Sequence, residues 1–183
     1  MERRDYLLGK WVIDPDHACA TFAVRHFMIA NVVGLFGKMT GTIYFDPPDI
    51  AHLSAEAEID VTSLSTGNRA RDEHLLSPDF LDAAKHTKIT FKTTRVEAAG
   101  DNRGKVTADL AIRGITRPVS FQVEWLGPVK SPFSGKSSIG FRGATKINRE
   151  DYGIETNYPM EGGGLVVGRE VEITFDVQAD LAD

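Results

Sequence analysis

Few side chains in this sequence stand at a spacing that could bind a metal or catalyse a reaction. The histidines are scattered along the chain, at His17, His26, His52, His74 and His86. The sequence contains no His-x-His, His-Glu-x-x-His or Cys-x-x-Cys spacing, which would place ligands around a metal. We therefore predict no metal, no cofactor and no catalytic residue. The single cysteine, Cys19, cannot form an internal disulfide and is expected to be a small structural side chain.

The segment Arg71-Asp72-Glu73-His74 has the composition of an acid–base cluster. On a short helix, however, Asp72 and Glu73 point in different directions, because neighbouring residues do not share a helix face. We therefore favour a scaffold of caps and salt links here over a catalytic site.

Two further polar positions each allow a structural and a functional interpretation. His26 continues the inward parity of Phe22 and Val24, so it either contacts a polar ligand head or is buried and bonded to the backbone. The segment 148–153, Asn-Arg-Glu-Asp-Tyr-Gly, has the composition of a turn, with its last glycine free to take a positive φ. Its Arg149 is expected to pair with a neighbouring carboxylate, with anion binding as the alternative.

The composition favours one globular domain over residues 1–183 and a small-molecule partner. A net charge of −5 and a pI near 5.5 provide no basic surface for a polyanion, so we expect no nucleic-acid binding. No stretch approaches membrane-spanning length, and no apolar run of a leader follows the charged residues at the start. We therefore expect a soluble, cytoplasmic protein with no integral membrane segment.

Period-2 alternation of apolar and polar residues runs along most of the chain. It is clearest in the hairpin predicted over residues 106–124, where two strands flank the turn Gly-Ile-Thr-Arg-Pro. Alternation predicts further strands at 10–14 and 17–26 (a pair or one bent strand), 34–46, 53–61, 88–96, 137–147 and 169–178. Between residues 67 and 82 the period changes and predicts a short helical insertion, with a helix at 69–76 followed by a second turn capped by Ser77.

About eight long strands in one domain must stack as two sheets or close into a barrel. Small residues recur on the inward-facing parity of the strands, namely Ala18, Ala20, Gly41, Ala55, Ala57, Ala108 and Gly143. A solid core would favour larger side chains because protein interiors pack densely. This pattern favours a barrel with a ligand cavity, and a filled sandwich is the alternative.

The sequence also resembles the YceI-like polyisoprenoid-binding family over nearly all of residues 11–178. The resemblance rests on blocks in order, which are Trp11-Val12-Ile13-Asp14 with His17, Phe22-Ala23-Val24-Arg25-His26, Gly34-Leu35-Phe36, Gly41-Thr42-Ile43, Arg71-Asp72-Glu73-His74-Leu75, Pro78-Asp79-Phe80, Ile89-Thr90-Phe91, Leu110-Ala111-Ile112-Arg113-Gly114-Ile115-Thr116, Ile147-Asn148-Arg149-Glu150-Asp151-Tyr152-Gly153, and Val167-Gly168-Arg169-Glu170-Val171. The sequence departs from the family pattern at His86-Thr87, where a Tyr-Pro pair is common, and at Leu76, where a polar residue is usual.

The resemblance implies an all-β, antiparallel, eight-stranded lipocalin-like barrel, usually dimeric, that encloses an isoprenoid or acyl chain without catalysis. We predict non-catalytic carriage or sequestration of a long polyisoprenoid, quinone tail or fatty acyl or amide chain by a homodimer. An enzyme acting on an isoprenoid or lipid is the alternative, and a pure interaction module ranks third. The predicted ligand-binding residues are Phe22, Val24, His26, Phe36, Ile43, Arg71, His74, Leu110, Phe121, Ile139, Phe141 and Arg149. Among these, His26, Arg71, His74 and Arg149 are expected to meet the polar head at the cavity mouth.

Overall fold

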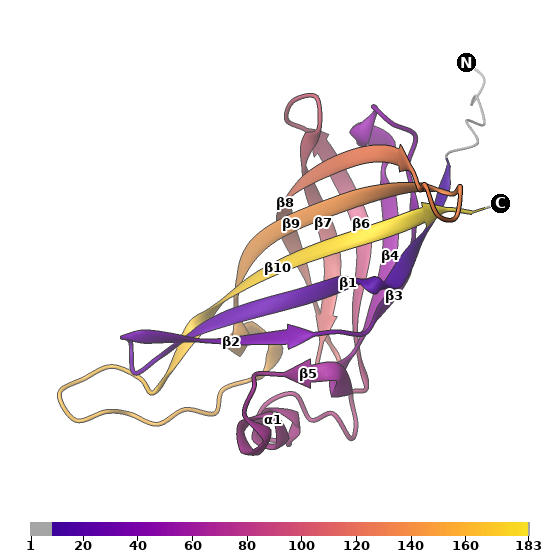
Figure 1. Cartoon of the computed structure of the whole chain (residues 1–183). Helices are drawn as coiled ribbons and strands as arrows, with labels where there is room; N and C mark the ends of the chain where they lie inside the picture. Colours follow the sequence, from indigo (N-terminus) through magenta and orange to yellow (C-terminus); the bar gives the residue numbers. More distant parts are fainter. Residues whose placement is uncertain (1–8, 183) are drawn as a thin grey trace.

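A computed structural model describes residues 9–182 as a β-barrel with one helix at its lower end (Figure 1). The strands are β1 (Lys10–His26), β2 (Ala30–Phe36), β3 (Met39–Tyr44), β4 (Ser54–Asp60), β5 (Leu64–Ser65), β6 (Lys88–Ala98), β7 (Arg103–Ile112), β8 (Ile115–Lys130), β9 (Ser137–Asn148) and β10 (Val167–Leu181). The helix α1 covers Arg69–Leu76, and three 3-10 segments cover η1 (Ile50–His52), η2 (Val61–Ser63) and η3 (Arg149–Tyr152).

The barrel closes because β1 pairs antiparallel with both ends of the sheet. Strand β1 pairs with β10 on one side and with β3 and β2 on the other, and β3, β4, β6, β7, β8, β9 and β10 follow as antiparallel neighbours. This closed eight-strand antiparallel barrel confirms the predicted fold class. Closure leaves every strand of the ring with a partner on both sides, so the inner faces of the strands enclose a common interior.

Strand β1 is a single bent strand, the second of the two forms that the sequence allowed. Its pairing with β10 is regular up to Ile13 and resumes at Ala18, so residues 14–17 bulge out of the ladder. Within the bulge the His17 imidazole donates a hydrogen bond to the Asp14 carboxylate, with 2.7 Å between Nδ1 and Oδ2. The bend lets β1 pair with two strands, β2 and β3, along the edge that faces away from β10.

The bend also explains why the strand predicted at 34–46 was wrong. Strands β2 and β3 follow each other along the same edge of β1, with β2 pairing to residues 20–26 and β3 to residues 10–12. The break at Gly37-Lys38 falls opposite the bulge in β1, where no ladder partner is available. One expected strand is therefore two.

The predicted hairpin and helix lie close to their expected positions. Strands β7 and β8 pair from Ile112 and Ile115 outward, so the turn is only Arg113-Gly114, both with positive φ, rather than the longer turn expected. Helix α1 covers the predicted residues and is capped by the Asn68 side chain, but the second helical turn at Ser77 is a non-helical turn.

The inner face of the barrel forms the core, as the alternation predicted. In β7 the inward residues Val106, Ala108, Leu110 and Ile112 are all buried, and the residues between them are more exposed. No helix within residues 9–182 is long and apolar enough to cross a membrane. The prediction that no leader begins the chain concerns mainly residues 1–8 and lies outside the described residues.

The bulge in β1 gives a prediction for pH dependence. The hydrogen bond from His17 lowers the pKa of Asp14, and the same contact raises the pKa of His17. The contact therefore stabilises the fold between these two pKa values. It is lost as the pH rises through the raised pKa of His17, and also as the pH falls through the lowered pKa of Asp14. An NMR titration of His17 should have its midpoint above about 6.5, and Asp14→Asn should lower it. An unchanged midpoint in the variant would refute the contact.

Candidate functional site

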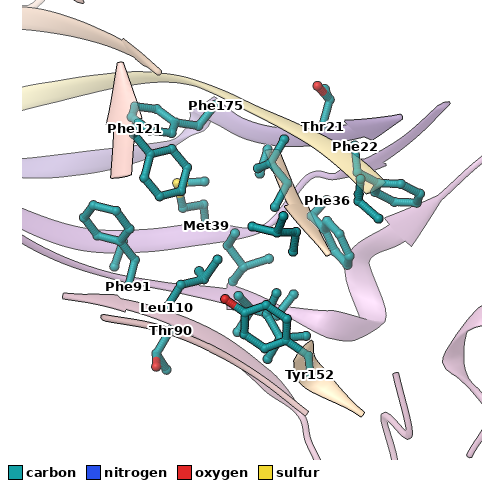
Figure 2. A pocket seen from close by; sticks show the side chains of 18 of the residues that line it. Thr21, Phe22, Phe36, Met39, Thr90, Phe91, Leu110, Phe121, Tyr152 and Phe175 are labelled. Carbon is teal, nitrogen blue, oxygen red and sulfur yellow. The ribbon is translucent and has the colours of Figure 1, made fainter. Parts of the chain in front are cut away.

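The barrel encloses a cavity of about 230 Å³ between the inner faces of its strands. One bound water needs only about 10–15 Å³, so the cavity is far larger than a packing defect. The lining side chains from β1 to β4 and β6 to β10 are almost all aliphatic or aromatic, with further residues contributed by 75–81 and 149–154. Two threonines in the wall, Thr21 and Thr90, turn their hydroxyls away from the cavity (Figure 2), and that of Thr21 is within hydrogen-bonding distance of the Thr174 hydroxyl.

Most of the predicted apolar site residues lie in the wall of this cavity. They are Phe22, Val24, Phe36, Ile43, Leu110, Phe121 and Phe141. Ile139 is also buried, but it belongs to the core and does not line the cavity. Several other lining residues were not in the predicted site set, among them Met39, Leu53, Leu75, Phe80, Phe91, Tyr152 and Phe175.

Five of the aromatic rings in the wall form two groups on different parts of it (Figure 2). Phe121 contacts both Phe91 and Phe175, with ring centroids 5.6 and 5.7 Å apart, respectively. Phe22 and Phe36 form the second group, with centroids 5.7 Å apart. Edge-on and tilted contacts at these distances are favourable. The large apolar side chains therefore hold one another against the wall.

Two glycines allow two of these rings to lie close over the neighbouring strand. Phe22 pairs across the ladder with Gly34, and Phe175 pairs with Gly143. A Cβ atom on Gly34 would lie 2.2 Å from the Phe22 ring, and one on Gly143 would lie 2.3 Å from the Phe175 ring. The rings occupy the places where side chains would stand. Gly143 thus leaves space in the cavity, as its small size suggested, because the Phe175 ring can lie over it.

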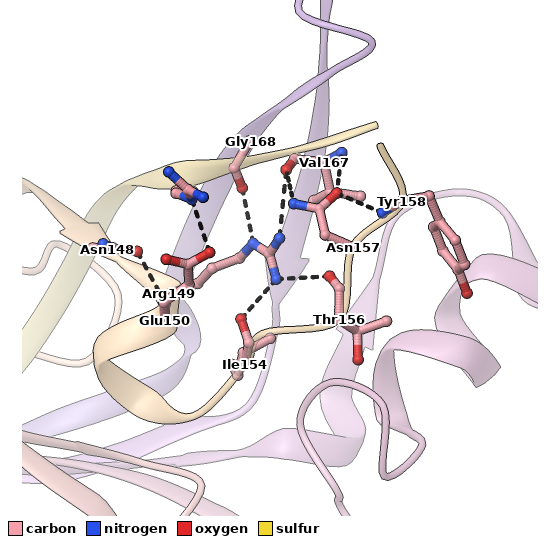
Figure 3. Close-up of polar contacts among 10 residues, drawn as sticks. Asn148, Arg149, Glu150, Ile154, Thr156, Asn157, Tyr158, Val167 and Gly168 are labelled. Carbon is pink, nitrogen blue, oxygen red and sulfur yellow. Dashed lines mark hydrogen bonds and ion pairs between the residues drawn. The ribbon is translucent and has the colours of Figure 1, made fainter. Parts of the chain in front are cut away.

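Arg149 lies at one end of the cavity and is 4% exposed. Its guanidinium donates hydrogen bonds to the backbone carbonyls of Gly168, Ile154, Thr156 and Val167, at 2.7 to 3.4 Å (Figure 3). Burial lowers the pKa of Arg149. The prediction that Arg149 pairs with a carboxylate is therefore wrong. Arg149 instead connects the segment after η3 to the start of β10 through these hydrogen bonds.

The three other predicted head-group residues lie outside the cavity wall. Arg71 donates to the hydroxyl and the carbonyl of Thr66, at 2.7 and 2.9 Å. The His74 ring stands edge-on against Phe80, which lines the cavity, and its Nε2 lies 2.9 Å from the Asp79 carboxylate. His74 therefore packs against the wall residue Phe80 without lining the cavity itself.

His26 is half-buried at the end of β1, and its ring packs on Phe27 with centroids 4.0 Å apart. The scaffold interpretation of residues 71–74 agrees with these contacts, since Asp72 accepts hydrogen bonds from Thr66 and Glu73 pairs with Arg69. Contact of any of these residues with a ligand head stays a prediction. Within residues 9–182 no cluster of three or more His, Cys, Asp or Glu side chains is placed to hold a metal.

Comparison with known proteins agrees with this architecture. The profile of the YceI-like domain matches residues 11–179. The UPF0312 protein SA2479 of Staphylococcus aureus is 36% identical over 175 residues, which are 96% of this chain and 98% of that protein. The chain belongs to the YceI-like family.

Solved structures of similar proteins have the same fold. The crystal structure of Burkholderia cenocepacia BcnA superposes with a TM-score of 0.78 at 25% identity, covering 91% of this chain and 98% of that one. A Campylobacter jejuni YCEI protein superposes with a TM-score of 0.74 at 29% identity, covering 87% and 90% of the two chains. A polyisoprenoid-binding domain from Saccharophagus degradans superposes with a TM-score of 0.71 at 17% identity, over 96% and 99%.

In this YceI-like protein the site residue with the most unusual surroundings is Tyr152, the last residue of η3. It is 1% exposed, and its hydroxyl has no hydrogen-bond partner among the described residues. Burial raises its pKa to about 12, so the hydroxyl is protonated at neutral pH. Its position after a polar turn has no strand or helix periodicity, so no sequence signal marked it as a lining residue.

The pairing of Phe175 with Gly143 gives a prediction about cavity size. In Gly143→Ala the new Cβ should force the Phe175 ring toward the barrel axis, reducing the cavity at a cost of about 1–3 kcal/mol in unfolding free energy. A crystal structure and ligand titration should show a smaller cavity and weaker binding of long chains. Gly140→Ala on the same strand is the control, because its Cβ would meet nothing nearer than 3.8 Å. Equal binding by both variants would show that the ring moves elsewhere.

The hydrogen bonds of Arg149 give a prediction about stability. Arg149→Met should lower the free energy of unfolding by about 3–5 kcal/mol, because several carbonyls lose a charged donor. Urea unfolding measures this loss. In the control, Arg142→Met, an exposed ion pair with Asp176 is removed and a loss below about 1 kcal/mol is expected. Similar losses in both variants would contradict the role of Arg149.

Proposed function

We propose that the protein binds a long apolar chain inside the barrel and carries or sequesters it without catalysis. The observation that carries this proposal is the closed barrel around a 230 Å³ cavity with an almost entirely apolar wall. An eight-strand barrel has an interior of the size that holds one small ligand. A cavity of this kind is poorly solvated by water, so an apolar occupant stabilises it.

Family membership supports a polyisoprenoid or another long apolar chain, such as a fatty acyl chain, as the ligand class. One structural neighbour, from Saccharophagus degradans, is described as a polyisoprenoid-binding domain. Its low sequence identity limits that likeness to the fold, so the ligand class is transferred as a proposal. The apolar wall fits an isoprenoid, a quinone tail and a fatty chain equally well, since it consists of aliphatic and aromatic side chains.

The wall also supports a binding role over the enzyme alternative. Among its described residues the only side chains that can titrate are Arg149 and Tyr152. The guanidinium of Arg149 bonds to backbone carbonyls, and the Tyr152 hydroxyl has no neighbouring base to activate it. A nucleophile and its base must lie within hydrogen-bonding reach of each other, and the wall offers no such pair among the residues described.

We further propose that the chain enters from the side where β1 and β10 project beyond the barrel (Figure 1). The lining residues Val24, Val167 and Val171 on these projecting parts are half-buried. At the other end, Val106 and Val123 are fully buried and close the cavity. The exposure of the wall therefore increases toward the projecting arm, which consists of the end of β1, strand β2 and the start of β10.

A homodimer and a cytoplasmic location remain further proposals. The projecting arm carries the exposed apolar side chains Phe27, Met28, Ile29 and Val33, which a second copy of the chain could cover. Size-exclusion chromatography with light scattering tests the dimer. Cell fractionation tests the location.

The proposal predicts an affinity that grows with chain length. Each buried methylene contributes about 0.8 kcal/mol, so each added methylene should raise affinity up to about fourfold until the cavity is filled. Association costs of about 4–15 kcal/mol mean that only long chains bind tightly. Thermal unfolding with alcohols of increasing chain length should show a rising melting temperature followed by a plateau. Native mass spectrometry of the purified protein should show an apolar adduct. A melting temperature independent of chain length, with no adduct, would refute the proposal.

A further inference from the structure

The cavity contains one polar group that an apolar chain would leave unsatisfied. The Tyr152 hydroxyl turns toward the side chains that line the cavity (Figure 2) and has no partner among the described residues. Burying a hydroxyl without a hydrogen bond costs about 1–3 kcal/mol. A phenylalanine would fill the same space without this cost. The hydroxyl therefore needs a partner that the described part of the chain does not provide.

The surroundings of Tyr152 fix the backbone that carries its side chain. Tyr152 ends η3, whose first turn is capped by the Asn148 side chain and whose last residue is followed by Gly153 in the left-handed conformation. The Arg149 guanidinium holds the same segment through the carbonyls of Ile154 and Thr156 (Figure 3). The backbone of η3 is thus held in place, and the buried Tyr152 hydroxyl does not reach solvent.

Water is a poor partner for this hydroxyl. A buried water is held by two to four polar groups, and the wall offers few. The threonine hydroxyls in the wall point away from the cavity, and the Arg149 guanidinium donates to backbone carbonyls. A water beside Tyr152 would therefore make one good hydrogen bond and leave its other sites unpaired.

We propose that Tyr152 is a hydrogen-bonding subsite inside the cavity for an uncharged oxygen acceptor on the bound chain. This inference rests on the proposed function and narrows its ligand class to neutral chains that carry a carbonyl, as quinones, ketones, esters and amides do. A protonated phenol donates to such an oxygen at no cost in charge burial. An ionised phosphate in the cavity would lose its hydration with only one free neutral donor to replace it.

The subsite can be tested with three probes of equal chain length, namely a linear methyl ketone, the corresponding alkane and the corresponding alkyl phosphate. All three are delivered from the same cyclodextrin carrier to the full-length protein and to Tyr152→Phe. The ratio of ketone affinity to alkane affinity should be roughly twofold to tenfold higher in the parent than in Tyr152→Phe, the range expected for one neutral hydrogen bond. Tyr152→Phe should bind the alkane at least as well as the parent.

The ligand-free variant provides a second readout that does not depend on the probes. Because the hydroxyl lacks a partner, Tyr152→Phe should unfold at the same or a higher temperature than the parent. If the hydroxyl instead bonds to a structural water, its removal in Tyr152→Phe should lower the melting temperature. Tyr158→Phe is the matched control, because Tyr158 is 55% exposed, and it should change neither preference nor stability.

The outcomes separate this inference from the proposed function. An equal ratio of ketone affinity to alkane affinity in the parent and in Tyr152→Phe would overturn the subsite while chain binding stands. Tightest binding of the phosphate by the parent would also overturn it and favour a charged head near Arg149. Failure of every probe to bind would overturn the proposed function and the subsite together.

Discussion

The structure depends on the pairing of β1 with β10, which closes the sheet. Closure gives each strand of the ring two partners and directs all inward side chains at one another. Strand β1 bends at residues 14–17, and β3 and β2 share its other edge. At one end β1 and β10 project from the barrel, beside the half-buried part of the cavity wall.

A closed barrel would normally fill its interior, and here the fold leaves space by holding large rings against the wall. Phe22 and Phe175 lie over glycines on the neighbouring strands, and each glycine lacks the Cβ atom that would lift the ring. Phe22 then contacts Phe36, and Phe175 contacts Phe121, which retains favourable aromatic contacts along the wall. The aromatic rings that lie over these glycines thus account both for the apolar character of the interior and for its empty volume.

Polar groups near the cavity serve two different purposes. Arg149 directs its hydrogen bonds to the backbone, and His74 supports Phe80 from outside the wall. These contacts stabilise the end of the barrel where the chain is irregular. Tyr152 differs from both, because its hydroxyl is buried and has no partner within the described chain. This lack of a partner supports the proposal that the bound chain provides one.

The sequence alone determined the strand alternation, the position of α1 and part of the apolar wall. These features follow from periodicity and local capping, which a single segment carries by itself. The closed barrel was implied by the family resemblance, because periodicity alone also allowed a filled sandwich. Tertiary structure decided the rest. Whether small residues leave empty space depended on the ring that lies across each glycine, and the split of residues 34–46 depended on a bulge in another strand. The partners of Arg149 and the isolation of the Tyr152 hydroxyl depend on residues brought together from β10 and η3. Hydrogen bonds between distant segments leave no periodic trace, so the sequence showed which residues were polar but not which were already satisfied.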